Sequence, residues 1–62
     1  MPTIRVEMFE GRTPEQKKNL VKALTQAASQ ALGSKPDSID VILYDIKKSD
    51  WATGGELWSE KK

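Results

Sequence analysis

TPEQKKNLVKALTQAASQALG, residues 13–33, has the pattern of one long amphipathic helix. Thr13 can act as the N-cap, and Pro14 suits the first helical position because no amide hydrogen is needed there. Gln16, three residues after Thr13, completes a capping box. Small and apolar side chains recur at three- and four-residue spacing and give the helix one face to bury: Leu20, Leu24, Ala27, Ala28 and Ala31.

Local signals also predict where this helix ends. Gly33 can adopt the left-handed conformation that often follows the last helical turn. Pro36 lies three residues later and prevents the helix from continuing. We therefore predict a helix from about Pro14 to Leu32.

Two strand-like segments flank the helix. Residues 3–8, TIRVEM, alternate between apolar and polar side chains, which is typical of a strand with one buried face. Residues 38–46, SIDVILYDI, are largely apolar on both faces, as expected for a strand covered on two sides. The order strand, long helix, strand is the β-α-β unit, so we expect parallel strands joined by a right-handed crossover.

The remaining segments are short. Residues 9–12 and 47–50 are predicted to be turns or loops. Residues 51–58, WATGGELW, carry the pair Gly54-Gly55 between hydrophobic groups, which favours a small hairpin or edge extension. The polar residues 59–62 are expected to fray.

The size of the chain limits the core that one copy can bury. Its 62 residues form one domain, residues 1–62. Hydrophobic residues make up 37% of the sequence, and it has no Cys and no His, so neither disulfides nor Cys/His metal sites can support a small core. Two strands with a helix on one face also leave the other face uncovered. We therefore expect an oligomer.

Charge and hydropathy argue against two classes of partner. Ten Lys and Arg against nine Asp and Glu give a net charge of +1 with both signs interspersed, whereas a nucleic-acid-binding domain usually carries a basic face. No apolar run approaches the ~20 residues of a membrane span, and no signal-peptide core follows the N-terminus. We expect a cytoplasmic protein that binds neither nucleic acid nor membrane.

The sequence contains few residue types and motifs that are typical of catalysis, which directs attention to Pro2. Without His, nucleophilic triads lack their usual base, and no phosphate-binding glycine loop is present. If Met1 is removed, Pro2 becomes a secondary amine whose pKa burial and nearby cations can lower, so that it acts as a general base at neutral pH. Alternatively, Pro2 only begins the first strand, where its missing N–H is tolerated.

Four features taken together are specific. Pro2 begins the first strand, EGR at residues 10–12 precedes EQK at 15–17, and GGEL follows the second strand at 54–57. This pattern closely resembles the 4-oxalocrotonate tautomerase family, the short-chain members of the tautomerase superfamily, over essentially the whole chain. The resemblance implies an α+β fold: a β-α-β protomer with two parallel strands, one long helix and a C-terminal hairpin, assembled as a hexamer (a trimer of dimers) without cofactor or metal.

The resemblance also implies an activity and the residues that carry it. Pro2 would be the general base that takes the proton of a dienol hydroxyl and returns it to a distal carbon, as with 2-hydroxymuconate in aromatic catabolism. The substrate would be a small oxo or enol acid. Arg12 would bind its carboxylate, and Trp51 would replace the usual Phe as the aromatic wall that keeps the pocket dry.

Asp40 is a departure from the family pattern. The family's second substrate-binding arginine, which a neighbouring subunit contributes, aligns with this aspartate. A unit charge about 6 Å away at an effective dielectric near 20 contributes roughly 3 kcal/mol, so Asp40 should raise the pKa of Pro2. Protonated Pro2 would then be an acid, and Asp40 would position water, as in hydratase-like dehalogenases and malonate semialdehyde decarboxylase.

The sequence leaves the surroundings of Asp40 and the make-up of the assembly open. Asp40 could turn away and pair with a Lys or Arg, or Arg5 could supply the missing positive charge. A homohexamer is the expected assembly, and in a hetero-hexamer a partner chain could contribute the second arginine. The chain could also be a non-catalytic oligomeric module. We expect the active species to begin at Pro2, because a Pro2 nitrogen bound to Met1 has no basic lone pair.

Overall fold

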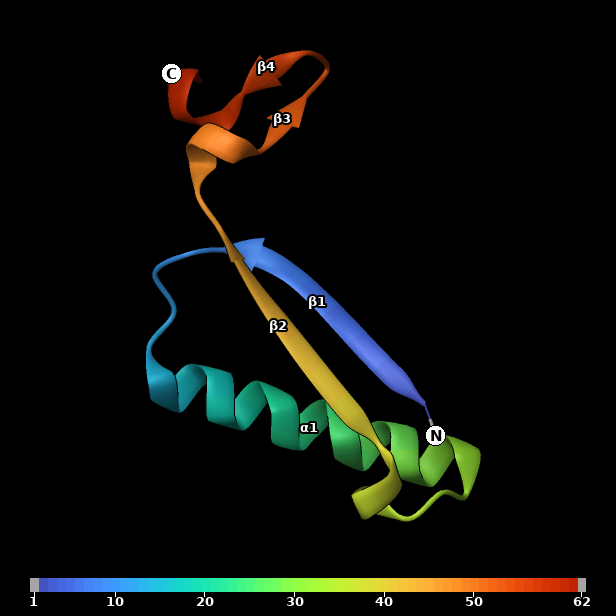
Figure 1. Ribbon diagram of the computed structural model, residues 1–62. Helices are drawn as coiled ribbons and strands as arrows, with labels where there is room; N and C mark the ends of the chain where they lie inside the picture. The colour runs from blue at the N-terminus through green and yellow to red at the C-terminus, as the bar shows by residue number, and fades with distance from the viewer. Residues whose placement is uncertain (1, 62) are drawn as a thin grey trace.

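The computed structural model describes residues 2–61, and its architecture is the predicted β-α-β unit followed by a C-terminal arm (Figure 1). Strand β1 spans Thr3–Phe9, helix α1 spans Pro14–Leu32 and strand β2 spans Asp40–Ile46. The two strands lie side by side, and α1 runs across one face of their sheet (Figure 1). Among residues 2–61, no helix is long and apolar enough to cross a membrane.

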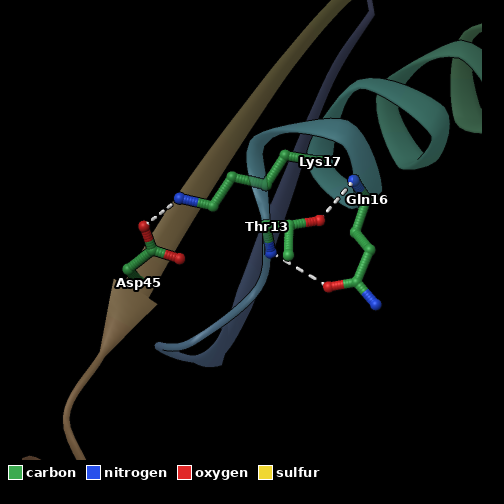
Figure 2. A network of polar contacts seen from close by, with 4 residues as sticks. All are labelled: Thr13, Gln16, Lys17 and Asp45. Atoms are coloured by element: carbon green, nitrogen blue, oxygen red, sulfur yellow. Dashed lines mark hydrogen bonds and ion pairs between the residues drawn. The ribbon is translucent and has the colours of Figure 1, made fainter.

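The ends of α1 confirm the predicted capping chemistry. The Gln16 backbone N–H donates to Thr13 Oγ1 over 3.1 Å, and the Thr13 backbone N–H donates to Gln16 Oε1 over 3.0 Å, which closes the capping box (Figure 2). Gly33 is left-handed, with φ 67°, and its N–H donates to the Ser29 carbonyl over 3.0 Å. The helix bounds agree with those predicted from sequence because both caps act within four residues of the helix end.

The two long strands are parallel and in full register. Pairing runs from Thr3 opposite Asp40 to Phe9 opposite Ile46. The ladder continues at its far end, where the Glu10 N–H donates to the Ile46 carbonyl over 2.9 Å. This pairing extends β1 to Phe9, one residue beyond the predicted end, because Ile46 supplies a partner that the local pattern of β1 does not reveal.

The start of β2 differs from the sequence prediction. Residues Pro36–Ser38 form a 3₁₀ turn, so Ser38 and Ile39 do not belong to the strand, which begins at Asp40. The Ser38 backbone N–H and hydroxyl both donate to the Lys35 carbonyl, over 2.9 and 2.7 Å. A serine that bonds to the backbone of its own turn competes with strand pairing, which explains the later start.

The C-terminal arm, residues 47–61, contains β3 (Ala52–Thr53) and β4 (Glu56–Leu57), which form the predicted antiparallel hairpin. Gly54 and Gly55 join them with φ of 63° and 84°, as a two-residue hairpin turn with two positive φ angles requires. Two 3₁₀ turns flank this hairpin. The expected loop contains a 3₁₀ turn, Lys48–Asp50, and the expected frayed tail contains another, Trp58–Glu60.

A single chain buries very little. Within residues 2–61, Ile39 is the only hydrophobic residue classed as buried, with 7% of its surface exposed. On the face of β2 that α1 does not cover, Ile42 and Tyr44 are 38% and 42% exposed. This face was predicted to be covered, and the chain itself supplies no cover for it.

The overall dimensions also indicate that one chain buries little of its surface. The radius of gyration is 14.7 Å, whereas a compact domain of this length has about 11 Å. The chain exposes 4998 Å², against about 4,000 Å² for a folded monomer of its size. The arm extends away from the β-α-β body (Figure 1), so the excess surface belongs to an open protomer suited to association.

Candidate active site

Pro2 lies immediately before β1 and is half-buried. Its carbonyl oxygen accepts a hydrogen bond from the Asp40 backbone N–H over 3.0 Å, so the parallel ladder begins one residue before the strand. Proline has no N–H, and the sheet engages this residue only through its carbonyl. The nitrogen is therefore not needed for strand pairing. Met1, whose removal we predict, lies outside the described residues.

Asp40 is the first residue of β2 and is exposed. It lies opposite Thr3 and, by alternation along the strand, on the same face as Ile42 and Tyr44. Within residues 2–61 its carboxylate makes no ion pair. Arg5 lies opposite Ile42 on this face, and the predicted possibility that Asp40 pairs with a cation is not realised within this part of the chain.

Arg12 lies in the loop between β1 and α1, directly after Gly11, whose φ is 113°. Its side chain helps to line an open cleft of about 330 Å³ between β1 and the first turns of α1. Three apolar side chains line the cleft where β1 and α1 face each other: Val6, Met8 and Leu20. Two polar side chains line it near the start of α1: Gln16 and Lys17. Such a cleft suits a molecule with an apolar body and an anionic end.

The polar groups around this cleft differ in their availability. Gln16 Oε1 is engaged in the capping box, and Lys17 forms an ion pair with Asp45 of β2 (Figure 2). Arg12 makes no ion pair with any described residue. Its guanidinium is therefore the cation best placed to bind a carboxylate, which it can hold with two parallel hydrogen bonds.

Trp51 belongs to the C-terminal arm and is half-buried. Its ring centroid lies 4.7 Å from that of Phe9, at an interplanar angle of 54°. Phe9 also contacts Trp58, with centroids 5.5 Å apart in an edge-to-face arrangement. The predicted wall residue is thus one member of an aromatic cluster formed by Phe9, Trp51 and Trp58.

The structure brings only two of the four predicted site residues together. Pro2 and Asp40 are neighbours at the start of the sheet, whereas Arg12 follows β1 in the loop before α1 and Trp51 follows β2 in the C-terminal arm. Arg12 lines the cleft beside Val6 and Met8, and neither Pro2 nor Asp40 is among the described residues that line it. One chain therefore does not surround a small molecule with both Pro2 and Arg12.

Two functional features of this region have no counterpart in the sequence predictions. Phe9 was assigned to a loop and given no contact with the tryptophans, and the Lys17–Asp45 ion pair joins residues 28 positions apart. Alternation along β2 could have placed Asp45 on the helix side of the sheet, which is the one signal in the sequence. No local pattern indicates the Phe9 contacts, because they depend on where the arm lies relative to the end of β1.

Comparison with known proteins agrees with the fold and identifies its class. Residues 2–61 match the family model described as tautomerase enzyme. The 2-hydroxymuconate tautomerase of Bacillus subtilis is 38% identical over 60 residues, covering 97% of both chains. The chain therefore belongs to the tautomerase family.

Solved structures indicate which type of tautomerase the chain resembles. A crystal structure of a 4-oxalocrotonate tautomerase homologue superimposes with a TM-score of 0.91 at 44% identity, covering 100% of this chain and 98% of the other. A subunit of the heterohexameric 4-oxalocrotonate tautomerase from Chloroflexus aurantiacus gives 0.93 at 32% identity, covering 100% of both chains. The protein is an enzyme of the 4-oxalocrotonate tautomerase type, which decides against a non-catalytic module.

Proposed function

We propose that this enzyme interconverts the enol or dienol and oxo forms of a 2-oxo acid such as 2-hydroxymuconate, with Pro2 as the general base once Met1 is removed. The observation that carries the proposal is the position of Pro2. Its carbonyl holds it at the start of the sheet, while its nitrogen takes no part in strand pairing. The named activity of the B. subtilis relative supports the choice of substrate class.

The chemistry is a proton transfer that needs no net change in oxidation state. The Pro2 amine accepts the proton of the enol hydroxyl, the electron pair moves through the conjugated system, and the ammonium returns the proton to carbon. An α-amino group has a pKa near ~8 in water, and a dry, cationic pocket lowers this value toward neutrality. The rigid ring fixes the direction in which the nitrogen presents its lone pair.

Arg12 and Trp51 take the binding roles. Arg12 lines an amphipathic cleft and has no competing ion pair among the described residues, so it binds a substrate carboxylate. Trp51 presents a large apolar ring, which excludes water from the reacting atoms. No step in this scheme requires a cofactor or metal.

The geometry supports a site that is shared between protomers. Pro2 precedes β1 and does not line the cleft beside Arg12, so a site that uses both would take them from different copies. The exposed surface of the chain and its open sheet face are available for such contacts. We propose a hexamer built from identical chains. The heterohexameric relative shows that chains of this fold also assemble in mixed form, in which a second chain could provide another arginine.

A second candidate reaction follows from Asp40. The backbone of Asp40 hydrogen-bonds to Pro2. The carboxylate of Asp40 has no ion-pair partner within residues 2–61. An anion near the amine favours the ammonium form. Pro2 would then act as an acid, while Asp40 positions water for addition to an unsaturated acid.

Intact mass and a pH–rate profile test the proposed function. The active species should begin at Pro2, and Pro2→Ala should lower kcat on phenylenolpyruvate by roughly 10²-fold or more, the usual contribution of a positioned general base. Pro14→Ala is a matched control, because it removes a proline from the first turn of α1 rather than from the site.

The outcomes separate the candidates. Unchanged turnover in Pro2→Ala, or full activity in protein that retains Met1, would contradict the role of Pro2 as base. A rate that requires the protonated form of the essential group, together with hydration of a 3-halo or acetylenic acid, would favour the second reaction. The cytoplasmic location expected from the sequence stays a prediction.

A further inference from the structure

We propose that Phe9 is a positioning residue for catalysis: its ring, packed between Trp51 and Trp58, holds the Trp51 indole in the orientation that walls the active site. This inference rests on the proposed function, because it treats Trp51 as part of the substrate pocket. Phe9 itself would act through Trp51 and need not touch the reacting atoms.

The first step is that Phe9 connects two parts of the protomer. It is the last residue of β1, so the sheet fixes its backbone opposite Ile46. Its ring contacts both tryptophans of the arm, at centroid distances of 4.7 and 5.5 Å. Figure 1 shows that the arm otherwise extends away from the β-α-β body beyond the end of β2.

The second step is that hydrogen bonds within the arm connect its two tryptophans. The Trp58 backbone N–H donates to the Trp51 carbonyl over 2.8 Å, and Trp58 Nε1 donates to Thr53 Oγ1 over 3.0 Å. The hairpin between them is closed by two glycines in the conformation that the turn requires. The backbones of Trp51 and Trp58 are therefore held next to each other, which places both rings within reach of Phe9.

The third step is that two lysine side chains lie over rings of the aromatic cluster. Lys48 Nζ lies 5.8 Å from the Phe9 ring centroid, and Lys61 Nζ lies 4.3 Å from that of Trp58. Cations over aromatic faces are attracted by the ring quadrupole. Tilted and edge-to-face ring pairs also have preferred geometries, unlike contacts between aliphatic side chains. The Phe9 ring thus selects an orientation of Trp51, where an aliphatic residue would only fill space.

The consequence for catalysis concerns water. If the Trp51 indole can rotate, the pocket admits water, and the essential amine returns toward its solution pKa while substrate orientation is lost. Loss of orientation by about 1 Å lowers turnover by up to roughly 10²-fold. A residue that merely stabilised the fold would instead lower activity equally at all pH values, in proportion to the folded fraction.

The test uses Trp58→Phe as a background, so that Trp51 is the only tryptophan, and compares Phe9→Leu with Phe9→Tyr. In Phe9→Leu, Trp51 emission should shift to longer wavelength and be quenched more strongly by acrylamide, and kcat should fall roughly 10-fold or more with a smaller change in KM. The acidic limb of its pH–rate profile should move to higher pH. Phe9→Tyr, which keeps the ring, should restore all three readouts.

Two further variants separate the Phe9–Trp51 contact from the lysine charge and from failed assembly. Lys48→Ala removes the cation that lies over the Phe9 ring and leaves the Phe9–Trp51 contact, so emission and pH profile should stay as in the background. If Phe9→Leu does not assemble, as size-exclusion chromatography would reveal, Phe9→Met supplies the same readouts with a more adaptable side chain.

The possible results are distinguishable. Unchanged kinetics in Phe9→Leu would overturn the positioning role, even where Trp51 emission shifts, because the ring would then order the arm without affecting the reaction. Unchanged Trp51 emission would overturn it as well. Pro2→Ala, measured alongside, separates the two proposals: activity that persists there contradicts the proposed function, whereas activity lost there with Phe9→Leu unaffected contradicts only the positioning role.

Discussion

The Asp40 backbone N–H donates to the carbonyl oxygen of Pro2 over 3.0 Å, so the backbone of an acidic residue is bonded to the residue whose amine we propose as the base. It also holds the start of β2 against the start of β1. The charge of the Asp40 side chain is therefore the simplest quantity to change in order to tune the reactivity of Pro2.

Asp40→Asn should lower the pKa of Pro2. Removing a nearby anion destabilises the ammonium form, so the free amine persists to lower pH and the acidic limb of the pH–rate profile for the tautomerase reaction moves down. We expect a shift of about 1 unit, because Asp40 is exposed and solvent screens part of its charge. Asp40→Arg should shift the limb further and increase turnover of dienol diacids.

Asp37→Asn is the matched control for this prediction, since Asp37 lies in the preceding 3₁₀ turn. It removes the same charge without changing the residue bonded to Pro2. Equal shifts in both variants would mean that only the net charge matters, and no shift in either would place Asp40 away from the site.

Mixing two inactive variants should restore activity. Pro2→Ala supplies an intact Arg12, and Arg12→Ala supplies an intact Pro2. If each site takes these residues from different protomers, random reassembly of equal amounts restores about a quarter of the sites. The measurement is turnover after joint denaturation and refolding, with each variant refolded alone as the control. A mixture no more active than its components would show that one protomer provides both residues.

Thr13→Ala should lower the free energy of unfolding by about 1 kcal/mol, because it removes the side-chain oxygen that accepts the Gln16 N–H at the start of α1. Urea denaturation at fixed protein concentration measures the change. Thr13→Ser keeps the accepting oxygen and should stay within a few tenths of a kcal/mol of the parent. A serine variant as unstable as the alanine variant would assign the effect to the lost methyl group.

The Lys17–Asp45 ion pair should contribute only about 0.5 kcal/mol, because the two side chains are 32% and 39% exposed. A double-mutant cycle with Lys17→Met and Asp45→Asn isolates the coupling energy from the separate effects of each change. The coupling should weaken as salt concentration rises. A coupling of several kcal/mol, or one insensitive to salt, would indicate that the pair is shielded by a neighbouring protomer.

The elements of this fold were predictable to differing degrees. The bounds of α1 follow from Thr13, Gln16 and Gly33, which act on backbone groups within a few positions of themselves. The start of β2 was not predictable in this way, because a 3₁₀ turn at Pro36–Ser38 competes with the strand for Ser38. The last residue of β1 depends on its partner Ile46, which lies on another segment.

The candidate site divides in the same way. Pro2, Arg12 and Trp51 could be named from the sequence because their residue types and spacing match a family pattern. Their arrangement could not, since the sequence does not indicate that the cleft beside Arg12, lined by Val6 and Met8, leaves out Pro2. This separation makes the proposed site a property of the assembly rather than of one chain.

The sequence by itself determined the order and type of the main elements, because helix caps, alternation and glycine turns act between residues close along the chain. Only the tertiary structure decided which distant side chains meet: Asp40 beside Pro2, Asp45 with Lys17, and Trp51 against Phe9. These contacts depend on strand register and on how the C-terminal arm packs, and a shift of one residue in register would turn each strand side chain to the opposite face.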